Sequence, residues 1–266
     1  MNAGNNAKYP SLKVLVVEDN MVNQKVTAAM LKHFSITADI AENGQIAVDM
    51  ARSNKYDLVL MDCQMPVMNG FDATIKLRKL DKNADATNVD IPILAMTANS
   101  APEDAVRCIE SGMNDVIAKP VELNTLINIL QKWVGPGEET DEVLPTVSGV
   151  IVSGVDDVLE NKVVKELYEL MGDDYKTVFD AFLTSLNEHL PNLKTAVENK
   201  NVQDVVTITH TLKGSSANIG ANRFSCASKR FLESAREGDL SDAASMLEKL
   251  LAESEKVCAA IQDLMK

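Results

Sequence analysis

Short apolar runs alternate with stretches of helical periodicity along residues 12–134, and this alternation constrains the fold more than any other feature of the sequence. Each run is followed by roughly ten or more residues with apolar positions at helical spacing, such as Val22, Val26 and Met30 after the first. Strands that alternate with helices join through right-handed crossovers into a parallel sheet with helices on both faces. We therefore predict an α/β domain with strands near 14–17, 37–41, 58–61, 93–96 and 115–118.

The second half of the chain has a different pattern. Glycine, proline and acidic residues are frequent between residues 135 and 154, which is typical of a linker. The apolar stretch 150–152 fits either an ordinary linker or a short additional strand. Residues 155–266 show long helical patterns, which predict an all-α bundle of about four or five antiparallel helices. A chain of 266 residues accommodates two such domains, at 11–134 and 155–266.

Three residues of the helical domain predict where its helices begin or break. Asp173 and Asp239 each follow a glycine in a turn-like segment, and such positions are typical of helix N-caps. Pro191 stands inside an otherwise helical pattern, so we expect a kink or a break there.

The composition excludes several classes of partner and compartment. With 39 acidic against 26 basic residues, the formal net charge of -13 repels nucleic-acid phosphates and anionic membrane surfaces. The four cysteines are far apart in sequence and form no metal-binding or disulfide pattern, which favours reduced thiols in a cytosolic protein. No apolar run reaches the ~20 residues of a membrane span. We therefore predict a soluble, cytoplasmic chain, or the cytoplasmic end of a membrane-bound protein.

Charged and hydroxyl side chains follow four of the predicted strands. Glu18 and Asp19 end the first, Asp62 the third, Thr97 the fourth and Lys119 the fifth. The carboxyl ends of parallel strands meet at one edge of a sheet, where such folds bind their ligands. Carboxylates that close together repel one another unless a cation neutralises them, and a hard divalent ion such as Mg²⁺ suits oxygen ligands. The sequence therefore predicts an acidic Mg²⁺ site.

Four motifs in order give residues 11–134 a strong resemblance to the receiver domain of two-component response regulators, especially those in hybrid histidine kinases. They are LVVEDNMVNQ at 15–24, MDCQMPVMNG at 61–70, AMTA at 95–98 and GMNDVIAKP at 112–120. The resemblance implies a flavodoxin-like fold with the strand order 2-1-3-4-5.

The resemblance also implies a role for each residue of the acidic site. Asp62 is the expected phosphoacceptor, and Asp62, Asp19 and the main-chain carbonyl of Gln64 are expected to bind Mg²⁺, with Glu18 acting through a water. Thr97 and Lys119 are expected to stabilise the oxygens of the incoming phosphoryl group together with the metal. Receivers usually have a cis peptide bond between the residues that correspond to Lys119 and Pro120.

One position departs from the receiver pattern. Most receivers have an aromatic residue three positions before the lysine, and its rotation accompanies the movement of the strand-four threonine. This chain has Val116 there. Because valine lies outside the acidic site, we expect phosphorylation to survive and the conformational response to be muted.

One of the three histidines of the chain, His210, lies in the stretch HTLKGSSANIGA. On a helix over 202–219, Val205, Leu212 and Ser216 share the core face, which places His210 and Lys213 on the exposed side. An exposed histidine on a helix is usually inert, and a glycine at 214 often marks only a helix contact. A mid-helix glycine nevertheless costs ~1 kcal/mol relative to alanine, so Gly214 favours a close approach by another protein.

The same stretch, with the similarity extending over residues 155–266, resembles the histidine-containing phosphotransfer (Hpt) domain. This resemblance implies that a nitrogen of His210 accepts a phosphoryl group while Lys213 offsets its charge. A receiver that docks on the bundle is then expected to supply the catalytic groups.

Together the two halves predict a phosphorelay protein. An upstream histidine kinase is expected to phosphorylate Asp62, and His210 is expected to exchange the group with a downstream response regulator. Docking of the two domains within one chain would benefit from an effective concentration on the order of millimolar, and docking between chains is the other option. No segment resembles an ATP-binding kinase core, so we expect no autophosphorylation from ATP.

Three alternatives stay open at this stage. The chain fits the C-terminal end of a membrane-bound hybrid sensor kinase with the same chemistry. It also fits a binding adaptor in which phosphorylation of Asp62 controls docking and His210 is idle. A hydrolase of small phosphates is disfavoured because the acidic site offers no further acid placed to activate water.

Overall fold

The structure is a computed structural model that describes residues 12–80, 90–97, 102–134 and 158–266. The chain divides into two compact units, an α/β unit and a helical unit. The predicted linker at 135–154 and the optional strand at 150–152 lie outside the described residues.

The α/β unit is built on five parallel strands in the order β2-β1-β3-β4-β5, which confirms the predicted topology. The register pairs Val17 with Ala41 on one side and with Met61 on the other. The strands lie within a residue of the predicted runs, at β1 Lys13–Val17, β2 Thr37–Ala41, β3 Leu58–Asp62, β4 Ile93–Thr97 and β5 Asp115–Ala118.

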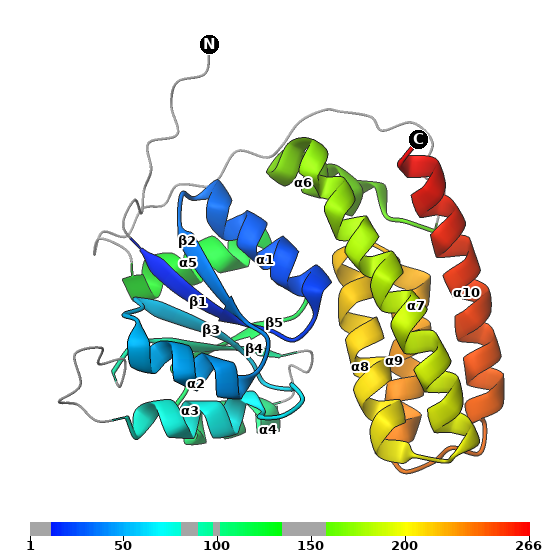
Figure 1. Ribbon diagram of the computed structural model, residues 1–266, viewed down its shortest axis with the longest axis horizontal. Coiled ribbons are helices and arrows are strands. Elements are labelled where there is room, and N and C mark those ends of the chain that lie inside the picture. The colour runs from blue at the N-terminus through cyan, green and yellow to red at the C-terminus, as the bar shows by residue number, and fades with distance from the viewer. Residues whose placement is uncertain (1–11, 81–89, 98–101, 135–157) are drawn as a thin grey trace. The chain divides into compact units, whose positions relative to one another are not determined.

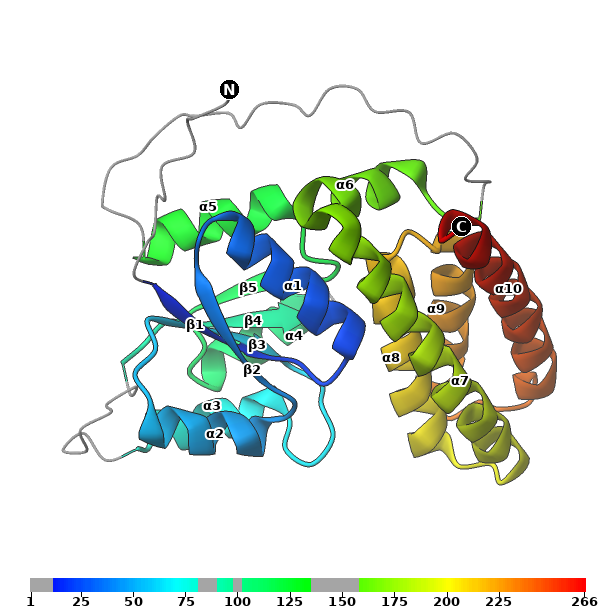
Figure 2. The ribbon, with the colours of Figure 1, turned by 45° about the horizontal axis from the view of Figure 1, so that its top comes forward.

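Helices cover both faces of this sheet, α1 and α5 on one and α2, α3 and α4 on the other (Figures 1 and 2). Along β1, Leu15 and Val17 join the core beneath α2, α3 and α4, while Val14 and Val16 are buried on the opposite face, as strand alternation requires. The helices are α1 Met21–His33, α2 Gly44–Ser53, α3 Gly70–Arg78, α4 Pro102–Glu110 and α5 Leu123–Val134.

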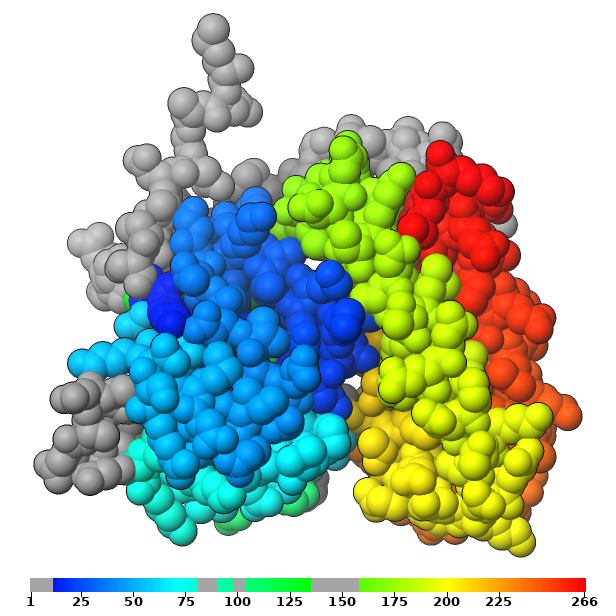
Figure 3. Space-filling view, viewed as in Figure 1, coloured from blue at the N-terminus to red at the C-terminus, as the bar shows by residue number. Residues whose placement is uncertain are grey.

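The helical unit contains a four-helix bundle. Its helix α7 packs against α8 and α10, and α9 packs against the same two, so the four close into a ring. Figure 3 shows how α7 forms much of the near face of this unit. The elements are α6 Asn161–Met171, a 3-10 turn η1 Gly172–Tyr175, α7 Lys176–Glu198, α8 Val202–Asn218, α9 Asn222–Arg236 and α10 Ala243–Leu264.

Two predicted helix N-caps in this unit were wrong, and the helix does not break at Pro191, which was one of the two outcomes expected there. Asp173 lies inside the 3-10 turn, and α7 begins only at Lys176. Asp239 accepts a hydrogen bond from the Ser241 backbone at 2.9 Å and so shapes the turn before α10, which begins at Ala243. Helix α7 continues through Pro191, because packing along its other turns compensates for the one N–H that proline lacks.

Four phenylalanines fill the centre of the bundle: Phe179, Phe182, Phe224 and Phe231. The rings of Phe182 and Phe224 meet edge to face with centroids 6.1 Å apart, which links α7 to α9. Each side chain is at most 1% exposed. Aromatic burial of this kind supplies a large share of the apolar area that a small bundle removes from water.

Substituting Phe182 with Ala is expected to destabilise the bundle by about 4 kcal/mol, because it removes a buried ring and leaves a cavity. The single tryptophan of the chain, Trp133, belongs to the α/β unit and gives a separate signal for that unit. In urea, the helical transition seen by circular dichroism should move to lower concentration while the Trp133 fluorescence transition stays. Leu94→Ala in β4 is the matched control and should shift the Trp133 transition instead. An unchanged circular dichroism midpoint for Phe182→Ala would contradict the prediction.

Candidate functional site

Three carboxylates meet where β1 and β3 end. Oxygens of Glu18, Asp19 and Asp62 all lie within 4.8 Å of one another, an arrangement that could hold a metal ion. Asp62 is the last residue of β3, and the other two directly follow β1. Because β1 and β3 are hydrogen-bonded neighbours, the parallel register brings the three side chains to the same edge. The predicted convergence of acids is confirmed.

Lys119 joins the same cluster from the end of β5. Its Nζ donates to Asp62 Oδ2 at 2.7 Å and also to Glu18 Oε2. Burial alone would lower the pKa of Lys119, but the negative charges of Asp62 and Glu18 outweigh it and raise that pKa. The lysine is therefore a fixed positive charge in the site. The peptide bond between Lys119 and Pro120 is cis, as the receiver resemblance implied.

The pKa of the third carboxylate, Asp19, shows how the crowding of negative charge affects the cluster. Burial, with the nearby charges of Asp62 and Glu18, raises its pKa to about 7. One ammonium group therefore does not balance three carboxylates, and the site has an unmet need for positive charge. Closely spaced oxygen ligands with that need fit a hard divalent cation such as Mg²⁺.

The loop after β3 is held tightly against Asp62. The Gln64 backbone N–H donates to Asp62 Oδ1 at 3.1 Å and fixes the carboxylate. A Cβ on Gly70 would lie 2.1 Å from the Asp62 carbonyl oxygen, so only glycine allows α3 to begin so close to this strand. Between them Val67 is 85% exposed and has a φ of 66, a rare conformation for a branched residue. Backbone strain of this kind is concentrated at functional sites.

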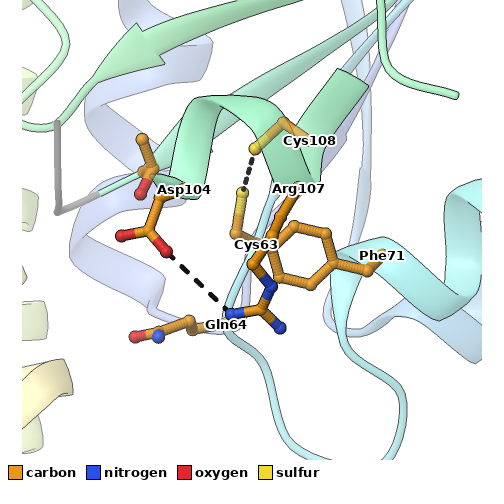
Figure 4. A pocket seen from close by; sticks show the side chains of 7 residues that line it. Cys63, Gln64, Phe71, Asp104, Arg107 and Cys108 are labelled. Carbon is orange, nitrogen blue, oxygen red and sulfur yellow. Dashed lines mark hydrogen bonds and ion pairs between the residues drawn. The ribbon is translucent and has the colours of Figure 1, made fainter. Parts of the chain in front are cut away.

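Thr97 ends β4, where its side chain is buried, and its carbonyl accepts the Lys119 N–H at 2.7 Å. Thr97 also lines a small hollow between the β3–α3 loop and α4, together with Phe71 and Arg107 (Figure 4). Val116, at the position usually aromatic in receivers, is partly buried and packs against the core beneath α2, α3 and α4. It is therefore a packing residue on that side of the sheet.

No sequence pattern predicts the thiol pair that lies in this hollow. Cys63 and Cys108 are both buried, and their sulfurs lie 3.6 Å apart (Figure 4). Because 45 residues separate the two in the chain, no spacing motif could reveal their proximity. Cys63 and Cys108 are free thiols, which agrees with the reduced cysteines predicted from the sequence, although their contact was not predicted.

In the helical unit, α8 positions His210 as predicted. Val205, Thr209, Leu212 and Ser216 are buried on one side of the helix, and His210 and Lys213 are partly exposed. The serines and threonines of the buried side donate to carbonyls of their own helix, for example Ser216 Oγ to Leu212 at 2.6 Å. Small side chains bonded in this way let α8 approach its neighbours without unsatisfied hydroxyls.

Two glycines near His210 have different roles. Gly220 has a φ of 74, and a Cβ there would lie 3.0 Å from Val163, so glycine is needed to end α8 against α6. Around Gly214 the bundle is open. Within residues 158–266, a Cβ placed on Gly214 would have no atom within 4 Å apart from its two chain neighbours and the nearby backbone of its own helix. Packing inside the bundle therefore does not explain this mid-helix glycine, which keeps space free one turn after His210.

The other two histidines have ordinary surroundings. The Nδ1 of His189 lies 2.8 Å from the Ser185 carbonyl one turn earlier in α7. The His33 ring contacts Phe34 edge-on at the end of α1. We predicted no function for either of these two histidines from the sequence.

Family models match both halves of the chain. The response regulator receiver domain matches residues 14–131, and the Hpt domain matches residues 177–265. With the sheet order, the acidic cluster and the helical bundle, these matches place the first half in the receiver family and the second half in the Hpt family. The chain is a receiver–Hpt protein of the two-component phosphorelay class.

Individual relatives agree with this assignment. Hybrid signal transduction histidine kinase B of Dictyostelium discoideum is 41% identical over 127 residues, which are 45% of this chain and 6% of that protein. The aerobic respiration control sensor protein ArcB of Escherichia coli is 28% identical over 215 residues, 79% of this chain and 26% of that protein. The chain thus spans only a small part of the length of these curated relatives.

The chain is also similar to solved structures, for example the following two. The receiver domain of a sensor histidine kinase from Pseudomonas aeruginosa, with a magnesium ion in its active site cleft, is 39% identical, covering 46% of this chain and 96% of that one, with a TM-score of 0.42. A chain of the complex between a Saccharomyces cerevisiae histidine phosphotransfer protein and the receiver of its downstream response regulator is 32% identical. It covers 47% of this chain and 89% of that one, with a TM-score of 0.43.

Among the residues that the structure describes, none of the helices combines the length and the hydropathy needed to cross a bilayer.

Proposed function

We propose that Asp62 accepts a phosphoryl group from the phosphohistidine of an upstream kinase, and that His210 exchanges a phosphoryl group with a receiver. The observation that carries this proposal is the site itself: a carboxylate at a strand end, fixed by the Gln64 N–H and flanked by Lys119. In the first step an oxygen of Asp62 attacks phosphorus, the P–N bond of the donor breaks and an acyl phosphate forms.

The residues around Asp62 have separate tasks in this reaction. The ammonium of Lys119 is already bonded to Asp62 and can move to an oxygen of the transferred group as charge develops there. The Thr97 hydroxyl can donate to a second oxygen. Asp19, Asp62 and the Gln64 carbonyl are the proposed ligands of Mg²⁺, with Glu18 acting through a water, and the ion when bound would neutralise negative charge on the phosphoryl oxygens.

The second step uses the helical unit. A lone pair on a neutral nitrogen of His210 attacks the phosphorus of an aspartyl phosphate, the P–O bond breaks and the aspartate carboxylate is restored. Lys213, one turn away on α8, offsets the charge of the phosphohistidine. We propose that this aspartyl phosphate is either the phosphorylated Asp62 of the same or another chain, or the phosphorylated aspartate of a downstream response regulator.

The stability of the labelled protein to acid and alkali tests this proposal. The wild-type chain is incubated with radiolabelled acetyl phosphate and Mg²⁺, and portions are treated with acid or with alkali. Two labelled species are expected: an aspartyl phosphate that alkali removes, and a phosphohistidine that acid removes and alkali leaves. A single class of label that withstands both treatments would be neither of these phosphates and would overturn the proposal.

Substitutions at Gly214 are expected to separate the stability of the helix from its accessibility. Gly214→Ala should stabilise the bundle by up to ~1 kcal/mol, because alanine favours the helix. Gly214→Leu should also fold, since the bundle leaves space for a side chain there, but should slow phosphoryl transfer to a separate receiver by about 10- to 100-fold. Urea denaturation and transfer kinetics provide the two measurements. Equal transfer rates for Leu and Gly would show that approach over this glycine is unimportant.

Phosphorylation is expected to change the structure only near the acidic site, because Val116 replaces the usual switch aromatic. Beryllofluoride, which mimics a phosphoryl group on Asp62, should shift backbone NMR signals around Asp62, Thr97 and Lys119 and leave most of α4 and β5 unchanged. Val116→Tyr, the matched variant, should extend the shifts into those elements. Widespread shifts in the wild type would contradict a muted response.

A further inference from the structure

The thiols of Cys63 and Cys108 lie in contact directly beside the proposed phosphoacceptor. Their sulfurs are 3.6 Å apart, and the two residues are only 3% and 0% exposed. Cys63 follows Asp62 at the end of β3, and Cys108 comes from the last turn of α4 (Figure 4). Two thiols from different elements therefore meet beside the acidic site, and the phosphorelay mechanism uses neither of them.

The backbone on both sides of this contact is well anchored. The Cys63 N–H donates to the Met96 carbonyl at 3.2 Å, and its carbonyl accepts the Gly70 N–H at 3.2 Å. On the other side, the Cys108 carbonyl accepts the Ser111 hydroxyl at 2.6 Å and the Met113 N–H at 3.1 Å. The sulfurs are thus held in proximity by the fold.

The pair lines the hollow that Thr97 also lines. On the α4 side of this hollow, Arg107 Nη1 lies 4.0 Å from Oδ1 of Asp104 in the preceding turn, and the Arg107 guanidinium lies 4.8 Å from the centroid of the Phe71 ring (Figure 4). Polar groups at the rim and sulfurs inside suit the entry of a small, uncharged, polar oxidant such as hydrogen peroxide. The remaining cysteines, Cys226 and Cys258, lie on the helical unit.

The distance between the sulfurs suits a covalent bond after a small movement. A disulfide needs about 2.05 Å between sulfurs, so the gap of 3.6 Å closes when each sulfur moves by somewhat less than ~1 Å. Disulfides that form in reducing compartments are mostly transient and regulatory. Burial raises the pKa of both thiols, so formation is expected to be slow, on the order of hours.

We propose that Cys63 and Cys108 form an oxidative modification site, at which a peroxide converts the two thiols into an intramolecular disulfide. The two S–H bonds and the O–O bond break, one S–S bond forms, and hydrogen peroxide is reduced to two molecules of water. The product ties α4 to the residue that follows Asp62. A thiol reductant restores the original pair.

The disulfide also acts on phosphorylation, and this second part rests on the proposed function of Asp62. Drawing Cys108 toward Cys63 shifts the start of the β3–α3 loop, whose next residue, Gln64, fixes the Asp62 carboxylate. A displacement of ~1 Å at a reacting group can lower a rate by up to ~100-fold. Oxidation is therefore expected to slow the phosphorylation of Asp62 by about 10- to 100-fold.

The test uses the full chain with Cys226→Ser and Cys258→Ser, so that two of the four cysteines remain. It is treated with hydrogen peroxide, denatured and alkylated, and analysed by mass spectrometry and peptide mapping. The expected product has lost two hydrogen atoms, has no thiol to alkylate and gives a peptide pair joined through Cys63 and Cys108. Cys108→Ala, which removes one sulfur, should give no such pair, and wild type before and after reductant provides a comparison free of substitutions. Two alkylatable thiols after peroxide, or sulfinic acids without a joined peptide, would overturn the proposal.

Phosphorylation by acetyl phosphate is then measured on the oxidised, the re-reduced and the Cys108→Ala proteins. The rate should fall on oxidation, recover with reductant and stay unaffected by peroxide in Cys108→Ala. If the joined peptide forms and the rate does not change, the regulatory part is wrong while the modification site stands. If the reduced protein accepts no phosphoryl group, the proposed function fails, and the peptide map still decides the question of the disulfide.

Discussion

Replacing Asp62 by Asn is expected to abolish covalent phosphorylation of the receiver, with a loss of rate on the order of 10³-fold or more. The amide has nearly the shape of the carboxylate but is not a nucleophile that forms an acyl phosphate at phosphorus. It also removes one negative charge from the cluster with Glu18 and Asp19. The measurement is the incorporation of label from acetyl phosphate in the presence of Mg²⁺, read as the alkali-labile fraction.

A surface acid serves as the control for Asp62. Asp49→Asn changes the net charge by the same amount on the exposed side of α2, where Asp49 pairs with Arg52, and should leave labelling unchanged. Trp133 fluorescence verifies that the α/β unit stays folded in both variants, since this indole donates to Asp115. Alkali-labile label of wild-type amount in Asp62→Asn would mean that another carboxylate is the acceptor.

Replacing His210 by Gln is expected to remove all acid-labile, alkali-stable label and to stop transfer to a separate receiver, again by about 10³-fold or more. Glutamine keeps a polar side chain on α8 but has no nitrogen with a lone pair that can attack phosphorus. The aspartyl phosphate should persist or accumulate, because it can no longer transfer its phosphoryl group to His210. Time courses of both label classes, with and without an added receiver, measure this effect.

The matched control for His210 is His189→Gln on α7. His189 has a ring nitrogen 2.8 Å from the Ser185 carbonyl, so its loss should affect helix stability slightly and transfer not at all. If His210→Gln transferred phosphoryl groups as fast as the wild type, His210 would be idle. The chain would then act as an adaptor controlled by phosphorylation of Asp62.

Much of the α/β unit could be predicted because its signals are local. Each strand is a short apolar run, and all five lay within a residue of the prediction. The strand order came from a family resemblance. Helix α8 could be predicted for the same local reason, since Val205, Leu212 and Ser216 follow helical spacing and are buried as expected. Asp19 lies at the end of the first strand, close to Glu18 and Asp62, as the parallel sheet predicted.

Helix ends were predicted less well, because a cap depends on the geometry of a whole turn. Asp173 and Asp239 have the residue type that is typical of an N-cap. Asp173 nevertheless lies within a 3-10 turn, and Asp239 accepts a hydrogen bond within a turn. Pro191 lacks one donor, and a helix of 23 residues packed on two neighbours tolerates that loss. Local propensity is smaller than the packing free energy of a long helix.

The sequence alone determined the two domain types, the acids at the strand ends and the helix face of His210. Those features depend on residue type and on the spacing of near neighbours. The tertiary structure decided which distant groups touch: Lys119 contacts Glu18 across 101 residues of chain, and Cys63 meets Cys108 across 45. Such contacts form only when crossovers bring separate strands and helices together, since only in the packed fold does burial hold their side chains within bonding distance.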